Sequence, residues 1–122
     1  PTGLPEALTQ SPVVAITFGA DGTLYCGTND GLYIVSADLV FQKELSISDG
    51  LASNTINDLA VRASGEVYIA TDGGLNVYNP QDATLDLVVI GTQLGGGAVF
   101  DLSVTSSDRL WFRTLSGVSN LE

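Results

Sequence analysis

The sequence contains no histidine and no methionine, and its only cysteine is Cys26. The absence of histidine excludes the usual forms of zinc chemistry, Ser-His-Asp catalysis and histidine-mediated proton transfer. The aspartates lack the alternating spacing of a calcium loop, and the glycine run at residues 95–97 precedes an expected strand rather than a helix. A lone cysteine also cannot form a disulfide within the chain. We therefore expect no metal, no other cofactor and no catalytic residues.

Basic residues are also scarce. Four lysines and arginines stand against 14 aspartates and glutamates, which gives a net charge of −10. This balance disfavours nucleic acid and anionic membranes as partners, because both require positive charge on the protein. At 122 residues the chain is long enough for one domain and too short for two. Because it begins at Pro1 and has no methionine, we expect it to be a processed or excised part of a longer protein.

A repeat with a period of 43 residues runs through the chain without an insertion. Each unit contains short apolar runs separated by glycine-containing turns, which is typical of β-strands joined by tight turns. A period of this length with four short strands per unit is characteristic of β-propeller blades. The sequence therefore predicts an all-β fold of propeller blades. The positions in register include Thr28, Thr71 and Thr114; Gly31, Gly74 and Gly117; and Tyr25, Tyr68 and Trp111.

The repeat divides the single domain into blade 1 at residues 13–55, blade 2 at residues 56–98 and an incomplete blade 3 at residues 99–122. We expect four strands in each of the first two blades, and we expect blade 3 to end before its outer strand. Residues 1–12 contain three prolines and are expected to form an edge or clasp segment. The expected strands are residues 13–18, 23–28, 32–35 and 39–47, then 56–61, 66–71, 75–78 and 85–90, and then 99–104 and 110–114.

An open row of blades predicts self-association. Stacking three blades covers only their inner faces, and large bare apolar faces are rare on soluble monomers. We expect the bare faces to lie at residues 13–18 and 23–28 in blade 1, and around Leu102, Val104, Leu110 and Phe112 in blade 3. Two chains would make six blades, which is a usual size for a closed ring. The sequence thus predicts a homodimer, with residues 1–12 completing blade 3 of its own chain or of the partner.

One face of this fold is expected to bind a ligand. In a propeller, the turns between second and third strands share a face with the connections between blades. A ligand there would contact Asp30, Asn54, Asp72 and Arg113. Arg113 occupies a position where the other units have Gly27 and Ala70, and its planar guanidinium suits a carboxylate or sugar hydroxyls. The alternative role of Arg113 is an ion pair with a nearby aspartate, either Asp101 or Asp72.

The middle and third units also carry a family pattern. They resemble the two-component regulator propeller repeats of periplasmic sensor regions in bacterial hybrid histidine kinases, and the resemblance covers nearly the whole chain. In blade 3, Arg113 departs from the small residue of that pattern. The matching residues are Gly50, Leu51, Ser53, Asn54, Ile56, Asp58, Leu59, Gly65, Tyr68, Ile69, Ala70, Thr71, Gly74, Leu75 and Tyr78, and then Asp101, Leu102, Leu110, Trp111, Phe112 and Thr114.

The resemblance implies a non-catalytic sensor-type module in the periplasm or outside the cell, which binds a ligand such as a sugar fragment or a partner. Two alternatives remain at the level of sequence. Lyase and lactonase propellers exist, although their sites use a histidine base or a metal held by several acids. A purely structural, self-assembling propeller fragment is the other alternative.

Overall fold

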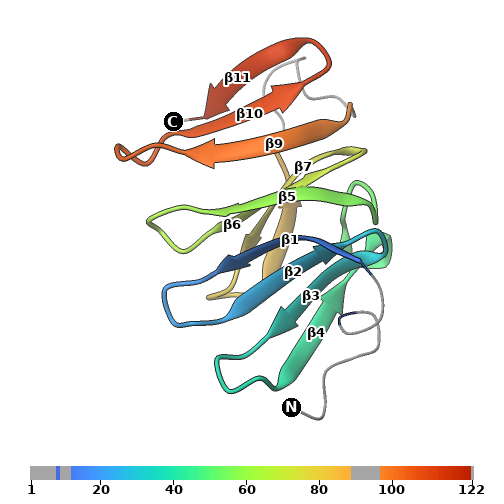
Figure 1. Ribbon diagram of the computed structural model, residues 1–122, viewed down its shortest axis with the longest axis vertical. Helices are drawn as coiled ribbons and strands as arrows, with labels where there is room; N and C mark the ends of the chain where they lie inside the picture. Colours follow the sequence, from blue (N-terminus) through green and yellow to red (C-terminus); the bar gives the residue numbers. More distant parts are fainter. Residues whose placement is uncertain (1–7, 9–11, 89–96, 122) are drawn as a thin grey trace.

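The computed structural model describes residue 8 and residues 12–88 and 97–121, and these residues form three antiparallel sheets that follow one another along the chain (Figure 1). Blade 1 contains β1 (Val13–Phe18), β2 (Leu24–Thr28), β3 (Gly31–Val35) and β4 (Phe41–Leu45). The short 3-10 helix η1 (Ile47–Asp49) leads to blade 2, which contains β5 (Ile56–Val61), β6 (Val67–Thr71), β7 (Gly74–Asn79) and β8 (Thr84–Leu87). Blade 3 contains β9 (Val99–Val104), β10 (Leu110–Thr114) and β11 (Gly117–Leu121).

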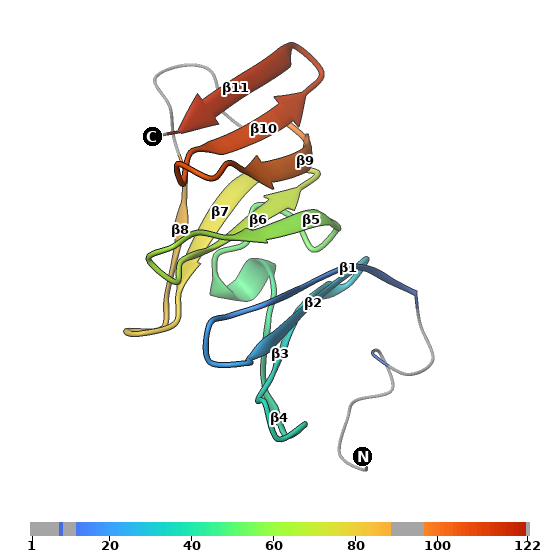
Figure 2. The same cartoon turned by 60° about the vertical axis from the view of Figure 1, so that its left-hand side comes forward.

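In each sheet, consecutive strands are neighbours, and the three sheets stack in chain order, as both views show (Figures 1 and 2). The predicted all-β propeller blades are therefore confirmed, and the described residues of blade 3 form three strands. Within the described part of the chain, no helix is long and apolar enough to span a membrane. The predicted clasp at residues 1–12 lies outside the described residues, apart from Leu8 and Pro12.

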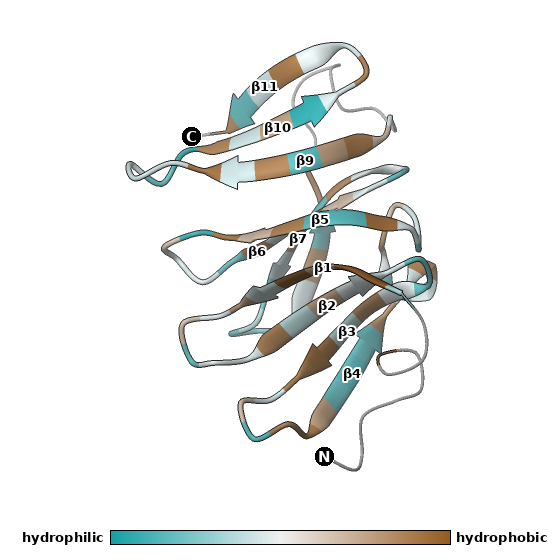
Figure 3. Ribbon diagram, viewed as in Figure 1, coloured by the Kyte–Doolittle hydropathy of each residue, from teal (hydrophilic) through white to brown (hydrophobic). Residues whose placement is uncertain are grey.

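The outer strands are shorter than the sequence predicted. β4 begins at Phe41 instead of residue 39, because Leu39 adopts a left-handed conformation (φ 67°) in the turn before it. β8 begins at Thr84, just after Ala83, which is also left-handed (φ 58°). The predicted end of this strand at residues 89–90 lies outside the described residues. β4 is also mainly hydrophilic, whereas β1 to β3 are mainly hydrophobic (Figure 3).

The core lies between the blades rather than inside them. One apolar cluster joins blade 1 to blade 2 and includes Leu32, Ile34, Ile56 and Ile69. A second cluster joins blade 2 to blade 3 and includes Tyr68, Leu75, Val99, Leu110 and Phe112. The inner strand of each following blade lies against the two inner strands of the blade before it, so β5 contacts β1 and β2, while β9 contacts β5 and β6.

The two faces of blade 3 differ from the prediction. Leu110 and Phe112 are buried, and Leu102 and Val104 pack with them against blade 2. The open face instead contains Trp111, because successive side chains of a strand point to opposite faces of the sheet. The sequence predicted an apolar face for β10, but only the stacking order decides which of its two faces is covered.

We call the open side the front face of blade 3. Strand pairing defines it, because residues directly opposite on neighbouring strands share a face. Trp111 pairs with Ser103 and Asn120, and Arg113 pairs with Asp101 and Val118. The front face of blade 3 therefore consists of Asp101, Ser103, Trp111, Arg113, Val118 and Asn120.

The opposite end of the stack is the back face of blade 1. Phe18 and Ile16 are 58% and 60% exposed there, whereas Leu24 is half-buried. The rest of β2, residues 25–28, is buried. The predicted bare face of blade 1 is therefore confirmed for β1 and is wrong for most of β2. In Figure 3, the hydrophobic β1 lies along one edge of its sheet.

Candidate functional site

The turns of the candidate ligand face are built from the repeated threonines and glycines. The hydroxyl of Thr28 donates to the carbonyl of Gly31 at 2.9 Å, and the hydroxyl of Thr71 donates to the carbonyl of Gly74 at the same distance. Gly31 and Gly74 have φ angles of 107° and 151°, which disfavour side chains. The repeated residues therefore fix the β2–β3 and β6–β7 turns, which lie on one side of the stack with η1 (Figure 1).

Asp30 and Asn54 lie on neighbouring loops of this face. The amide of Gly31 donates to the carbonyl of Asn54 at 2.7 Å, so the connection after η1 lies against the β2–β3 turn. The side-chain oxygen of Asn54 accepts a hydrogen bond from the amide of Ile47 at 2.9 Å. Asn54 thus holds the connection after η1 in place through these two hydrogen bonds, while the side chain of Asp30 is exposed.

Asp72 extends the same face toward blade 3. Its carboxylate accepts a hydrogen bond from the Asn57 side-chain amide at 2.9 Å, and that amide also donates to the carbonyl of Val99 at 2.9 Å. Asn57 lies at an irregularity in the pairing of β5 with β6, and β1 and β9 are irregular at the equivalent place. The repeat pattern did not predict Asn57 as a site residue, because its counterparts Val14 and Phe100 share no chemistry with it.

Arg113 is placed on the front face of blade 3, apart from the other three predicted residues. Its Nε donates to the carboxylate of Asp101, and its guanidinium carbon lies 5.1 Å from the centre of the Phe100 ring. The expected ion pair of Arg113 with Asp101 is therefore present. Both side chains stay accessible, with 54% and 63% of their surface exposed. Beside them, Trp111, Phe112 and Val118 line a mainly apolar hollow of about 160 Å³.

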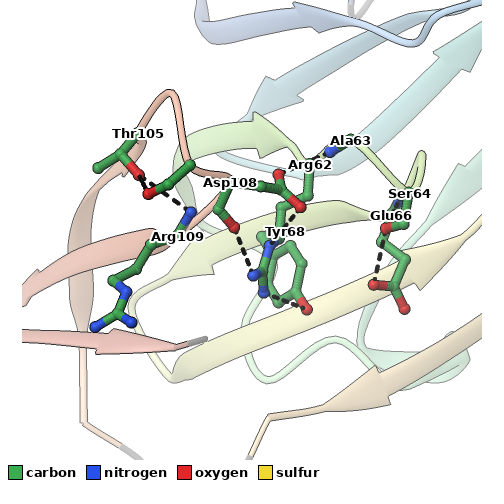
Figure 4. Close-up of polar contacts among 9 residues, drawn as sticks. Arg62, Ala63, Ser64, Glu66, Tyr68, Thr105, Asp108 and Arg109 are labelled. Carbon is green, nitrogen blue, oxygen red and sulfur yellow. Dashed lines mark hydrogen bonds and ion pairs between the residues drawn. The ribbon is translucent and has the colours of Figure 1, made fainter.

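A second polar cluster joins blade 2 to blade 3 (Figure 4). It lies at the β5–β6 and β9–β10 turns, on the other side of the stack from the ligand face (Figure 1). The guanidinium of Arg62 donates to the carbonyl of Asp108 at 2.7 Å and lies over the Tyr68 ring, 5.5 Å from its centre. The amide of Ala63 donates to the Asp108 carboxylate at 2.8 Å. These contacts lock the β5–β6 turn to the β9–β10 turn.

Asp58 links the same two blades. Its carboxylate accepts hydrogen bonds from its neighbour Leu59 and from the amide of Leu102 in blade 3, both at 2.8 Å. Asp58 thus forms a hydrogen bond to the backbone of the next blade. Asp101, its counterpart one repeat later, pairs with Arg113 instead.

Burial raises the pKa of two further groups. For Tyr25, burial together with the nearby Tyr78 and Asp21 raises the pKa to about 12. Burial also raises the pKa of the Cys26 thiol, which is buried. Among residues 12–88 and 97–121, no three histidine, cysteine, aspartate or glutamate side chains gather as a metal site would require.

No protein-family model matches the chain, and no curated protein matches it by sequence. Solved structures do match. An extracellular domain assigned to the hybrid two-component system BT3049 of B. thetaiotaomicron superposes with a TM-score of 0.75 at 21% identity over 92% of this chain. A similar domain assigned to BT4673 gives a TM-score of 0.71 at 22% identity over 91%. Virginiamycin B lyase from Staphylococcus aureus gives a TM-score of 0.64 at 12% identity over 92%.

The chain spans only 16% and 15% of the two regulator domains and 41% of the lyase. Its three blades thus correspond to a part of each of these larger structures. The likeness to the regulators is in shape and strand order, at low sequence identity. It establishes that this chain has the propeller fold of extracellular two-component domains, as the sequence resemblance predicted.

Proposed function

We propose that this chain is a non-catalytic binding module of sensor type that acts outside the cytoplasm, in the periplasm or at the cell exterior. The observation that carries the proposal is the rigid face formed by the β2–β3 and β6–β7 turns and the connection after η1. Hydrogen bonds between backbone groups fix these loops to one another, so polar side chains on them are held in place before a ligand arrives. Pre-organisation of this kind reduces the entropy cost of binding.

The ligand of this proposal is small and polar, such as a sugar fragment. Asp30 and Asp72 offer exposed carboxylates as acceptors, and Asn54 contributes an amide between them. Arg113 keeps an accessible guanidinium on the front face of blade 3, and we propose that its fork of donors contributes to binding a carboxylate or paired hydroxyls. The likeness to extracellular domains of two-component systems supports a sensing role.

A thermal-shift experiment with a panel of mono- and disaccharides and amino acids tests this proposal. A binder raises the melting temperature in a concentration-dependent manner, because it stabilises only the folded state. For any binder found, Arg113→Ala and Asp72→Asn should weaken binding and leave the melting temperature of the ligand-free protein nearly unchanged. Val40→Glu, which changes an exposed residue at the outer edge of blade 1, is the matched control.

Two results would contradict the proposal. One is a panel with no shift at millimolar ligand. The other is a large loss of stability in Arg113→Ala with unchanged binding, which would assign Arg113 to structure alone.

A further inference from the structure

We propose that the front face of blade 3 docks the back face of blade 1 of a second copy of this chain, in the way each blade packs on the next within one chain. The contact would join two copies head to tail. It would repeat the two blade interfaces that the structure already contains.

The inner strand of the following blade makes most of each internal interface. Leu59 and Val61 of β5 pack toward blade 1, and Leu102 and Val104 of β9 pack toward blade 2. Their counterparts one and two repeats earlier are Ile16 and Phe18 of β1. Among the described residues no blade packs on these two side chains, and about three fifths of each is exposed.

The receiving face is open at the other end of the stack. Tyr68 of blade 2 is 7% exposed because blade 3 covers it, whereas its counterpart Trp111 is 37% exposed. Leu75 is fully buried, whereas its counterpart Val118 is 65% exposed. The front face of blade 3 and the β1 part of the back face of blade 1 are therefore both exposed within the same chain, which favours a second copy over an unrelated partner.

A hydrogen bond sets the register of this contact. Asp58 reaches across its interface to the amide of Leu102 at 2.8 Å. Asp101 has the equivalent position in blade 3, and Ile16 has the position of Leu102 in blade 1. We therefore expect the Asp101 carboxylate to accept a hydrogen bond from the Ile16 amide of the second copy. A carboxylate accepts several hydrogen bonds, so Asp101 can keep its bond to Arg113.

The side chain of Arg113 is much larger than its counterparts in the other two blades, Gly27 and Ala70, so the contact must leave room for it. At the equivalent place in blade 1, a Cβ added to Gly27 would lie 2.5 Å from a methyl carbon of Ile56, so the blades approach closely there. Between blades 2 and 3, the equivalent positions are occupied by Ala70 and the smaller Val99, which belong to one apolar cluster. The second copy would present Val13, which is again a valine. The rest of the Arg113 side chain is turned aside onto Phe100 and Asp101.

Light scattering coupled to size-exclusion chromatography tests the proposal on the full chain at micromolar concentrations. The wild-type chain should associate. Trp111→Glu and Ile16→Glu should each weaken association by at least about 30-fold, because each places an unpaired charge at the centre of the contact. Val40→Glu adds the same charge at an exposed apolar position outside both faces and should leave association unchanged. Circular dichroism establishes that each variant remains folded.

Mixing the two variants tests whether the front face of one copy binds the back face of another. Trp111→Glu retains an intact back face, and Ile16→Glu retains an intact front face, so the mixture should recover a 1:1 complex that neither variant forms alone. A wild-type chain that stays monomeric at high micromolar concentration would overturn the proposal. So would association that persists unchanged in both variants.

Discussion

The carboxylate of Asp58 in blade 2 accepts a hydrogen bond from the backbone amide of Leu102 in blade 3, with a distance of 2.8 Å between oxygen and nitrogen. The corresponding position in blade 1 is Ala15, which packs in the apolar cluster between blades 1 and 2. The two interfaces of this chain are therefore held differently. The first is mainly apolar, and the second adds polar contacts from Asn57, Asp58 and Arg62.

Replacing Asp58 with alanine should lower the free energy of unfolding by about 1–3 kcal/mol, because the Leu102 amide loses its partner within a half-buried interface. Asp58→Asn keeps a side-chain oxygen as acceptor and should lose less. Urea unfolding followed by circular dichroism measures both. Equal losses for the two substitutions would show that the charge, rather than the acceptor, matters.

The contact of Arg62 with the β9–β10 turn predicts a second effect on stability. Only 10% of the Arg62 side chain is exposed, so Arg62→Ala removes a buried charge-assisted hydrogen bond and should cost about 1–3 kcal/mol. Asp108 has a left-handed φ of 65°, which asparagine also tolerates. Asp108→Asn should therefore be the milder change. Hydrogen exchange should detect the loosening first in β9 and β10, and uniform loosening of all three blades would contradict this account.

The close approach of Gly27 to Ile56 predicts a non-additive pair. Gly27→Ala should destabilise by about 1–3 kcal/mol through overpacking. Ile56→Val should cost about 0.5–1.5 kcal/mol by itself. The double variant recreates the Ala70 and Val99 pair of the next interface, so it should be more stable than the sum of the single changes by at least about 0.5 kcal/mol. Strict additivity in thermal unfolding would argue against a steric origin.

Tyr25 predicts a loss of stability at alkaline pH. Its pKa is raised from 10.0 to about 12 in the folded protein, so the unfolded chain loses this proton at lower pH than the folded chain. The contribution of the neutral tyrosine is complete below pH 10 and is lost as the pH rises from 10 toward 12. Tyr25→Phe should reduce this alkaline loss. Denaturant unfolding at several pH values measures it, and identical profiles for the two proteins would exclude Tyr25 as the source.

The sequence predicted much of the fold because the repeat is local. The threonine and glycine of each turn act within four residues, through a hydroxyl that closes the turn and a backbone with positive φ. Strand bounds followed from the same spacing, and β1, β5 and β9 agree with the prediction at both ends. The bounds of the outer strands β4 and β8 agreed less well with the prediction. Leu39 and Ala83 adopt left-handed conformations there, which leucine and alanine rarely do, so the sequence did not indicate them.

The candidate site was predictable in part. The turns that carry Asp30 and Asp72 could be assigned to one face from the strand order alone, because a meander returns each second turn to the same side. The hydrogen-bond partners of these residues could not be predicted from the strand order. Asn57 bonds Asp72 because a pairing irregularity in β5 redirects it, and Arg113 was expected to pair with Asp101 or Asp72 until the β9–β10 register placed Asp101 opposite it.

The sequence by itself determined the blade, its turns and the number of strands, since these depend on residues close together along the chain. Tertiary structure decided which face of each blade is covered. An apolar strand such as β10 is compatible with stacking on either side, and the choice depends on the direction in which blades follow one another. That direction buries Leu110 and Phe112 and exposes Trp111 and Arg113, because alternate side chains of a strand point to opposite faces.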